Sequence, residues 1–326
     1  MSGISLVSTG LYHPEHVRGN DWYINYYASQ GIEVKGLLAS LGQQNRYLIN
    51  DDSENTLTMA VAAAEMALEQ AGWQACDLDL IIFSSQTPEY LIPATALKIH
   101  HALGGGERTL SYDMNANCAG LLIAVEQVSR IMMSRLSCQR ALVVGGDYLG
   151  PHSEGEPFYH SCFADSAVAV LLEKSTASEG VIDSEFRVQT SVINNSLFPA
   201  NGLSSVQREE LSSRVKFIPF DDAVCVDVAG ESIEVLLTRN GLTGEDIRYY
   251  FLSQMSLGNI RKICQLLNIP AAKAPFIGDT YGYTATNSPF IAFHELKKQG
   301  KLSRGDHLVF WTIGAGWQSA AVLIKY

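Results

Sequence analysis

Residues 113–125 read DMNANCAGLLIAV, a turn of small residues followed at once by an apolar run. The turn carries Cys118, and the run predicts an amphipathic helix that begins directly after it. The positive end of a helix favours a thiolate over a thiol, so this stretch is typical of a cysteine nucleophile. A free cysteine is also among the most buried residue types, and the local sequence leaves a core role equally open.

Strand-like apolar runs alternate with helical patterns on both sides of this stretch, which predicts an α/β fold built from β-α-β units. The chain reads as two similar halves, residues 1–173 and residues 181–326, joined by a polar linker at 174–180. Helices are expected at 55–71, 94–103, 230–240, 260–267 and 289–299. Strands are expected at 79–84, 109–113, 141–145, 167–172, 249–253, 307–312 and 320–324.

The composition fits a soluble protein of enzyme size. The chain has 326 residues, of which 47% are hydrophobic and 17% charged, and it can bury a large core. No apolar run reaches the roughly 18 residues of a membrane helix, and the first residues lack the basic and apolar regions of a signal peptide. The six cysteines form no CxxC pair and no zinc spacing, so we expect a reduced, cytoplasmic setting without a metal.

Four further stretches carry a resemblance to a known family. They are GISLVSTGLYHPE at 3–15, DLIIFSSQTPEYLIPATA at 79–96, ALVVGGD at 141–147 and FADSAVA at 163–169. Together with the Cys118 turn they resemble the thiolase-fold condensing enzymes, most closely β-ketoacyl-[acyl-carrier-protein] synthase III, whose second motif reads DLII…TTPDYLFPSTA. The resemblance implies a thiolase-like fold of two fused β-α-β halves in five α-β-α-β-α layers, with Cys118 as the nucleophile.

Two positions depart from the pattern of that family. The family's histidine lies in a PHQAN motif after a strand, whereas residues 251–256 read FLSQMS and place Ser253 at that position. The family's asparagine lies in YGNTSAASIP, whereas residues 281–289 read YGYTATNSP and place Tyr283 there. A different register places Asp279 at the asparagine position. No histidine occurs between residues 161 and 293.

These departures bear on the chemistry. In the family the two side chains donate hydrogen bonds to a thioester enolate, and one such donor contributes about 2.7–4 kcal/mol. Ser253 and Tyr283 can donate, but a serine cannot accept a proton near neutral pH as imidazole does. We therefore expect acyl capture by Cys118 without malonyl decarboxylation. His160 and Asp279 are candidate substitute bases, and the alternative for His160 is a loop or dimer contact.

Acyl capture also needs an oxyanion hole of backbone N–H groups. The resemblance assigns one N–H to Cys118 and another to a glycine-rich loop, here GAGW at 314–317, so that Gly314 and Gly316 are the candidates. A plain hairpin turn is the alternative for this loop. The acyl pocket is expected to depend on loops such as residues 184–212. Candidates for its lining, with plain core as the alternative, are Met255, Phe290 and Trp317, while Cys162 is expected in the core.

The segment that holds coenzyme A in the family differs as well. The family carries WIVTRTGI, whose Trp and Arg hold the adenine, whereas residues 36–43 read GLLASLGQ. The expected acyl donor is therefore an acyl carrier protein, or coenzyme A held in another way; either brings a phosphopantetheine thioester arm, and no further cofactor is expected. The net charge of −11 argues against nucleic acid as a partner. An acidic carrier protein needs a basic patch, for which the candidates are Arg130, Arg135, Arg140, Arg208, Arg214, Lys216, Arg261 and Lys262.

Two functions of different kinds remain open. One is a Cys118-dependent acyltransferase of fatty-acid-like or specialised metabolite biosynthesis. The other is a catalytically degenerate subunit that pairs with an active ketosynthase homologue. The retained cysteine favours the enzyme, and the loss of both second-half residues favours the subunit. In either case we expect a homodimer or a heterodimer with a related subunit, with the strand at 109–113 near the two-fold axis.

Overall fold

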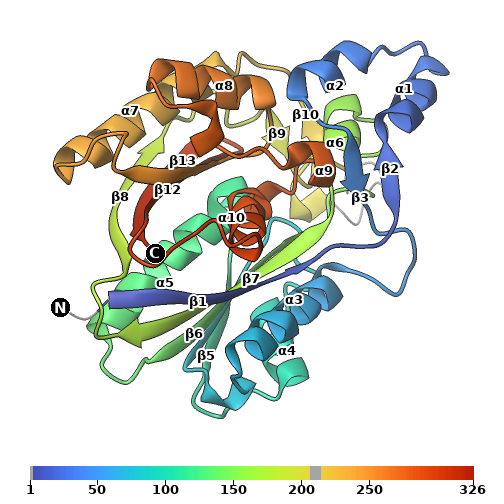
Figure 1. The fold of residues 1–326 in the computed structure, drawn as a ribbon. Coiled ribbons are helices and arrows are strands. Elements are labelled where there is room, and N and C mark those ends of the chain that lie inside the picture. The colour runs from blue at the N-terminus through green and yellow to red at the C-terminus, as the bar shows by residue number, and fades with distance from the viewer. Residues whose placement is uncertain (1–2, 206–213) are drawn as a thin grey trace.

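Two β-sheets form the frame of the molecule, with helices between them and on both outer faces (Figure 1). The computed structural model describes residues 3–205 and 214–326. The first sheet has the order β1-β7-β6-β4-β5, with β1 (Gly3–Tyr12), β4 (Leu80–Ser84), β5 (Leu110–Met114), β6 (Arg140–Asp147) and β7 (Ser166–Ser175). The second sheet has the order β11-β12-β13-β8, with β8 (Gly180–Val188), β11 (Ile247–Leu252), β12 (His307–Gly314) and β13 (Gln318–Lys325).

The described helices fall into three layers and a small cap. The helices in chain order are α1 (Asn20–Ala28), α2 (Lys35–Leu41), α3 (Thr56–Ala71), α4 (Thr95–Leu103), α5 (Gly120–Ser134), α6 (Pro157–Cys162), α7 (Ala223–Arg239), α8 (Leu257–Leu266), α9 (Gly278–Tyr281) and α10 (Ser288–Lys298). Two short strand pairs complete the regular structure, β2 (Val17–Gly19) with β3 (Asn45–Tyr47) and β9 (Ser196–Leu197) with β10 (Lys216–Phe217). Among the described residues no helix has both the length and the apolar character to cross a membrane.

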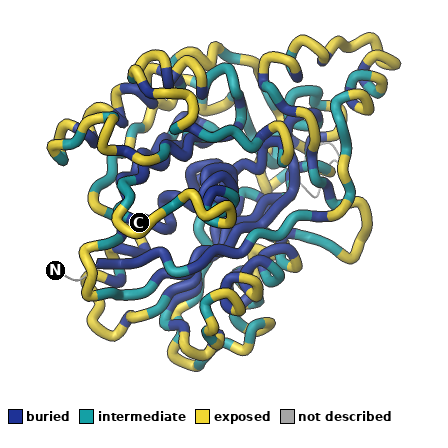
Figure 2. The backbone as a smooth tube through the Cα atoms, in the orientation of Figure 1, coloured by how far each residue is buried: buried dark blue, intermediate teal, exposed yellow. Residues whose placement is uncertain are grey.

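The alternation of side chains along each strand explains the layers. On β4, Leu80 and Ile82 pack against α5 and α10, whereas Ile81 and Phe83 pack against α3 and α4. The second sheet packs its other face against α7 and α8. Helices α5 and α10 therefore lie between the two sheets and belong to the most deeply buried part of the molecule (Figures 1 and 2). This order of layers confirms the predicted five-layer α-β-α-β-α thiolase-like fold.

The two sheets repeat one plan. Strands β1, β7, β6 and β4 pair in the order antiparallel, antiparallel, parallel, and β8, β13, β12 and β11 pair in the same order. The turn between β7 and β8 lies at residues 176–179, inside the predicted linker, whose ends belong to the two strands. Each predicted half therefore supplies one sheet, and the two halves share the helical layer between the sheets.

Two sequence-based expectations about elements were too coarse. Helix α7 begins at Ala223, seven residues before the predicted start at Gly230. Strand β8 continues to Val188, into residues 184–212 that were expected to be loop. The sequence did not predict β8, because β8 is an edge strand. Edge strands carry polar side chains that obscure the alternation of apolar residues. Residues 206–212 of that span, with Arg208, lie outside the described residues.

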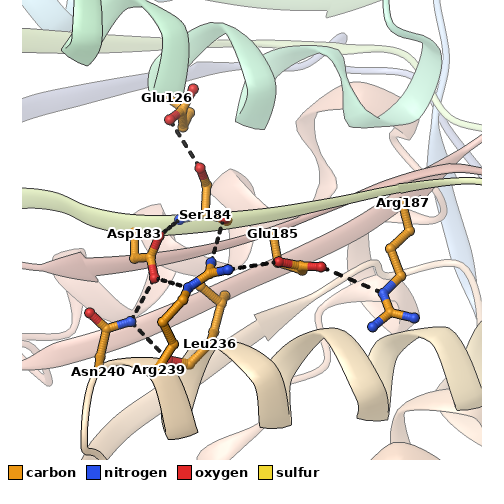
Figure 3. Close-up of polar contacts among 8 residues, drawn as sticks. All are labelled: Glu126, Asp183, Ser184, Glu185, Arg187, Leu236, Arg239 and Asn240. Carbon is orange, nitrogen blue, oxygen red and sulfur yellow. Dashed lines mark hydrogen bonds and ion pairs between the residues drawn. The ribbon is translucent and has the colours of Figure 1, made fainter.

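A polar network joins the two halves at the edge strand β8 (Figure 3). The Oγ of Ser184 on β8 donates to the buried Glu126 of α5 over 3.1 Å. From the other side, the guanidinium of Arg239 at the end of α7 contacts Asp183 at 2.6 Å and Glu185 at 3.1 Å. The network therefore connects the middle helical layer, the second sheet and the outer layer.

Candidate active site

Cys118 lies where β5 gives way to α5. It is the middle residue of a short 3-10 turn, η2 (Asn117–Ala119), and is 7% exposed. The turn needs Asn117 in the left-handed region with φ 53°, a conformation that asparagine tolerates better than most residues. Gly120 then starts the helix where a Cβ would lie 2.2 Å from the Oγ of Ser84. The predicted Cys118 turn followed by a helix is confirmed.

The Cys118 side chain lines a cavity of about 130 Å³ whose walls come from both halves of the chain. Predicted site residues from the second half line the same cavity, namely Ser253, Tyr283 and Gly314. The rest of the wall is mainly apolar and aromatic, and its large side chains include Phe158, Tyr159, Phe163, Phe217, Phe220, Met255, Trp311 and Trp317. An apolar cavity with a few convergent polar groups is the usual form of a small-molecule site.

Tyr283 and Ser253 form a chain of hydroxyl groups that ends at the sulfur. The Tyr283 hydroxyl is hydrogen-bonded to Cys118, and the Oγ of Ser253 donates to the Tyr283 oxygen over 3.5 Å. Tyr283 is 1% exposed, and burial raises its pKa well above 10. The phenol therefore stays protonated and acts as a hydrogen-bond donor.

Two further residues at the sulfur were missed by the sequence analysis. The Nε2 of Gln86 lies 3.7 Å from the Sγ of Cys118 and 3.2 Å from Oδ2 of Asp147. A signal for both existed, because Gln86 follows β4, Cys118 follows β5 and Asp147 ends β6, and these neighbouring strands are parallel. The carboxyl ends of parallel strands meet at one edge of a sheet.

Opposing effects act on the protonation of Cys118. Burial raises the pKa of the thiol to about 11, and the charge of Asp147 acts in the same direction. Hydrogen bonds from Tyr283 and Gln86 lower the pKa, but they do not offset burial. Burial of the sulfur therefore opposes the positive end of the helix, which favours the thiolate. The direction of this shift favours the thiol at neutral pH.

The glycine-rich loop is both a hairpin turn and a wall of the cavity. It joins the antiparallel strands β12 and β13, with a hydrogen bond of 3.0 Å from Trp317 N to Gly314 O. A Cβ on Gly314 would lie 3.3 Å from the backbone nitrogen of Cys118. A Cβ on Gly316 would instead meet the side chain of Ile193. Of the two candidates for the oxyanion hole, Gly314 is thus the one that lies against the backbone of Cys118.

The two candidate substitute bases do not lie in this cavity. His160 on α6 pairs its Nδ1 with the Tyr27 hydroxyl at 2.8 Å and lines a separate pocket with Trp22 and Tyr26. Burial lowers the pKa of His160. Asp279 is exposed on α9, where its Oδ1 accepts a hydrogen bond from its neighbour in the chain. The structure therefore does not bring either group to Cys118.

The remaining candidates divide between the cavity and the core. Met255 and Trp317 line the cavity, whereas Phe290 is fully buried between the sheets, in the core position that was its alternative. Cys162 is fully buried, which confirms the expected core position. Cys225 lines the cavity as a second thiol. No group of three or more metal-ligating side chains is arranged for an ion in the described parts of the chain.

Comparisons with known proteins agree with this architecture. The model for 3-oxoacyl-[acyl-carrier-protein (ACP)] synthase III matches residues 112–190, and the model for its C-terminal part matches residues 237–326, so that together they cover just over half of the chain. The β-ketoacyl-[acyl-carrier-protein] synthase III of Rickettsia canadensis is 28% identical over 326 residues, which cover 98% of this chain and 99% of that protein. The related synthase III 1 of Bacteroides thetaiotaomicron is 26% identical over 336 residues, which cover 100% and 98%.

A solved structure shows the same fold. The crystal structure of 3-oxoacyl-[acyl-carrier-protein] synthase III from Aquifex aeolicus matches with a TM-score of 0.88 at 23% identity, covering 99% of this chain and 100% of that one. The fold and the cysteine site thus define a thiolase-fold condensing enzyme, a class of acyltransferases. Within this class, the chain belongs to the 3-oxoacyl-[acyl-carrier-protein] synthase III family.

Proposed function

We propose that this protein takes an acyl group from a phosphopantetheine thioester onto Cys118 and passes it to an acceptor without decarboxylating a malonyl unit. The donor is an acyl carrier protein or coenzyme A, and the pathway is fatty-acid-like or specialised metabolite biosynthesis. The observation that carries the proposal is the position of Cys118, buried against an apolar cavity beside the Tyr283 and Gln86 donors.

The acylation step balances without a resident base. The Cys118 sulfur attacks the thioester carbonyl, a carbon–sulfur bond forms to Cys118, and the bond to the carrier sulfur breaks. The proton of the Cys118 thiol passes to the departing carrier thiolate, so that a free carrier thiol leaves. In this proposal the backbone N–H groups of Cys118 and Gly314 hold the carbonyl oxygen while it carries negative charge.

Decarboxylation makes a different demand, because an enolate oxygen must be stabilised while carbon dioxide leaves. Ser253 and Tyr283 stand at the two family positions, and the Tyr283 hydroxyl is already hydrogen-bonded to the sulfur. Loss of two full oxyanion donors would cost on the order of 5–8 kcal/mol if their effects added. We therefore propose that release of carbon dioxide from malonyl thioesters is negligible.

The test is direct. The purified protein is incubated with a panel of acyl-coenzyme A and acyl-carrier thioesters, and its intact mass is measured. We expect one acyl adduct on the wild-type protein and on Cys162→Ala. Labelled malonyl-carrier protein is then followed for carbon dioxide, and rapid release would contradict the proposed absence of decarboxylation.

One observation favours the second candidate, a catalytically degenerate subunit. Burial raises the pKa of Cys118, so the thiol is not activated in the resting chain. A subunit of this kind takes up no acyl group from any donor, and it co-purifies with an active ketosynthase. The intact-mass experiment separates the two candidates.

Assembly and carrier docking follow from the same proposal. Strand β5 is an edge of the first sheet and leaves Leu110 45% exposed, which favours a dimer across that edge. A stable monomer in light scattering would contradict it.

Around the cavity, Arg261 and Lys262 are exposed on α8 beside the lining residue Ile260. We expect Arg261→Glu with Lys262→Glu to raise KM for an acyl carrier protein and to leave acyl-pantetheine turnover unchanged.

A further inference from the structure

Gln86 lies between two groups that both accept hydrogen bonds. Its side-chain nitrogen is 3.7 Å from the sulfur of Cys118 and 3.2 Å from Oδ2 of Asp147. Its backbone nitrogen donates to Oδ1 of the same carboxylate over 2.8 Å. The family motif quoted above has threonine at this position, where this chain has Gln86.

We propose that Gln86 is a third side chain of the nucleophile's site: its amide donates one N–H to the Cys118 sulfur and the other to Asp147, and so stabilises the thiolate. This inference rests on the proposed role of Cys118 as the nucleophile. Gln86 thereby supplies, from the first half of the chain, a donor that complements Tyr283 from the second half.

The orientation of the amide follows from the chemistry of Asp147. Burial raises the pKa of Asp147 to about 6, so above that pH the group is a carboxylate that only accepts hydrogen bonds. The amide oxygen of Gln86 is then excluded from its side, and the NH₂ group must face it. That NH₂ group has two hydrogens, and the second lies toward the sulfur. Asp147 is itself held in place, because it is 2% exposed and also accepts from Ser85 Oγ at 3.3 Å and Thr286 N at 3.2 Å.

The charges around the sulfur explain why a donor is needed here. The titratable side chains that act on Cys118 include Asp147 on β6, Tyr159 on α6 and Tyr283 before α10. Asp222 and Cys225 line the same cavity. Burial raises the pKa of both tyrosines, so they stay neutral. Asp147 is the group that brings a negative charge toward the thiolate. Gln86 stands between the two anions and offers a hydrogen to each.

Two variants of similar length test the role. Gln86→Met keeps the bulk of the side chain but has no donor, and Gln86→Glu keeps the shape but has an acceptor. The rate of alkylation of Cys118 by iodoacetamide is measured from pH 7 to pH 10 by peptide mass. We expect Gln86→Met to slow alkylation at pH 8 about threefold to tenfold and to shift the pH profile to higher pH. Gln86→Glu should slow alkylation further.

The control is Glu89→Gln, an exposed residue three positions along the same segment, which should behave as wild type. Melting temperatures show whether a variant is folded, and the uncharged Gln86→Met keeps the test decisive if Gln86→Glu is unstable. A folded Gln86→Met with an unchanged pH profile would overturn the inference, as would a Gln86→Glu that matches wild type. Alkylation needs no acyl donor, so failure of acyl transfer would refute the proposed function while leaving this result to stand alone.

Discussion

The helices α5 and α10 begin in the same way, and the difference between their first turns separates the two halves of the molecule. Each is preceded by a 3-10 turn, η2 (Asn117–Ala119) and η6 (Ala285–Asn287), whose first residue has a positive φ of 53° or 47°. The middle residue is Cys118 in one turn and Thr286 in the other. The Oγ1 of Thr286 accepts a hydrogen bond from the backbone N–H of Leu121 at 2.9 Å, whereas the thiol of Cys118 lines a cavity.

The comparison teaches that the repeated fold presents two equivalent positions and uses them differently. The hydroxyl of Thr286 satisfies a free N–H at the start of the neighbouring helix, which is a structural role. The second half contributes to the cysteine site by other residues, Ser253 after β11 and Tyr283 before η6. Cys118 therefore comes from one half, and most of the surrounding cavity from the other.

The largest expected effect comes from moving the thiol between the two turns. Cys118→Ala should abolish the acyl adduct, and adding Thr286→Cys to it should not restore the adduct, because that side chain faces the start of α5 rather than the cavity. Intact mass and peptide mapping measure both variants. An adduct at residue 286, or an undiminished adduct in Cys118→Ala, would show that the two turns are not distinguished as the structure indicates.

The rate of alkylation of Cys118 should rise about a hundredfold between pH 7 and pH 9. With a pKa of about 11, the thiolate fraction of Cys118 should rise about tenfold per pH unit from pH 7 to pH 9. A free cysteine derivative, with an ordinary pKa near 8.5, should level off in the same range. Iodoacetamide kinetics at Cys118 measure the profile. A plateau below pH 9 would mean that the helix N-terminus dominates over burial after all.

The donor from the second half should have the next largest effect. Tyr283→Phe removes the hydroxyl that is hydrogen-bonded to the sulfur and keeps the ring that closes the cavity. A hydrogen bond to a charged group contributes about 1.5–3 kcal/mol, so acylation should slow about tenfold to a hundredfold. Ser253→Ala should slow it less, because Ser253 acts through Tyr283. Stopped-flow kinetics measure the acylation rate of both variants. Equal losses of rate would contradict this order.

The sequence predicts the fold better than the site, for a physical reason. Apolar periodicity and the Cys118 turn are local, and they predict most strands and helices. The candidates Ser253, Tyr283 and Gly314 came from the resemblance to the condensing enzymes and not from a local pattern. The roles of Gln86 and Asp147 depend on the parallel register of β4, β5 and β6, which no local pattern contains. The effect of burial on the pKa of Cys118 is likewise not contained in a local pattern, because burial is set by the packing of the whole chain.

The structural role of the second turn gives a smaller effect on stability. Thr286→Val preserves shape and removes the Oγ1 that accepts from Leu121 N. Loss of a capping acceptor typically costs about 0.5–2 kcal/mol, and the free energy of unfolding should fall by that amount. Denaturant unfolding measures it, with Thr284→Val, a buried neighbour whose Oγ1 has no partner among the described residues, as the matched control. Equal losses of unfolding free energy in the two variants would contradict the capping role of Thr286.

The smallest effect is expected at the edge of the second sheet (Figure 3). Burial raises the pKa of Asp183, but hydrogen bonds from Arg239 and Asn240 outweigh it and lower the pKa below its ordinary value. The contribution of Asp183 to stability is therefore present above that ordinary value and is lost as the pH falls through the lowered pKa. Arg239→Ala should destabilise the protein less than Thr286→Val does. Because Arg239 is partly exposed, the loss should shrink in high salt. Denaturant unfolding in low and high salt measures the loss in the free energy of unfolding. A loss for Arg239→Ala that exceeds that of Thr286→Val and persists in high salt would contradict this prediction. It would mean that the polar network, rather than the shared apolar layer, holds the two halves together.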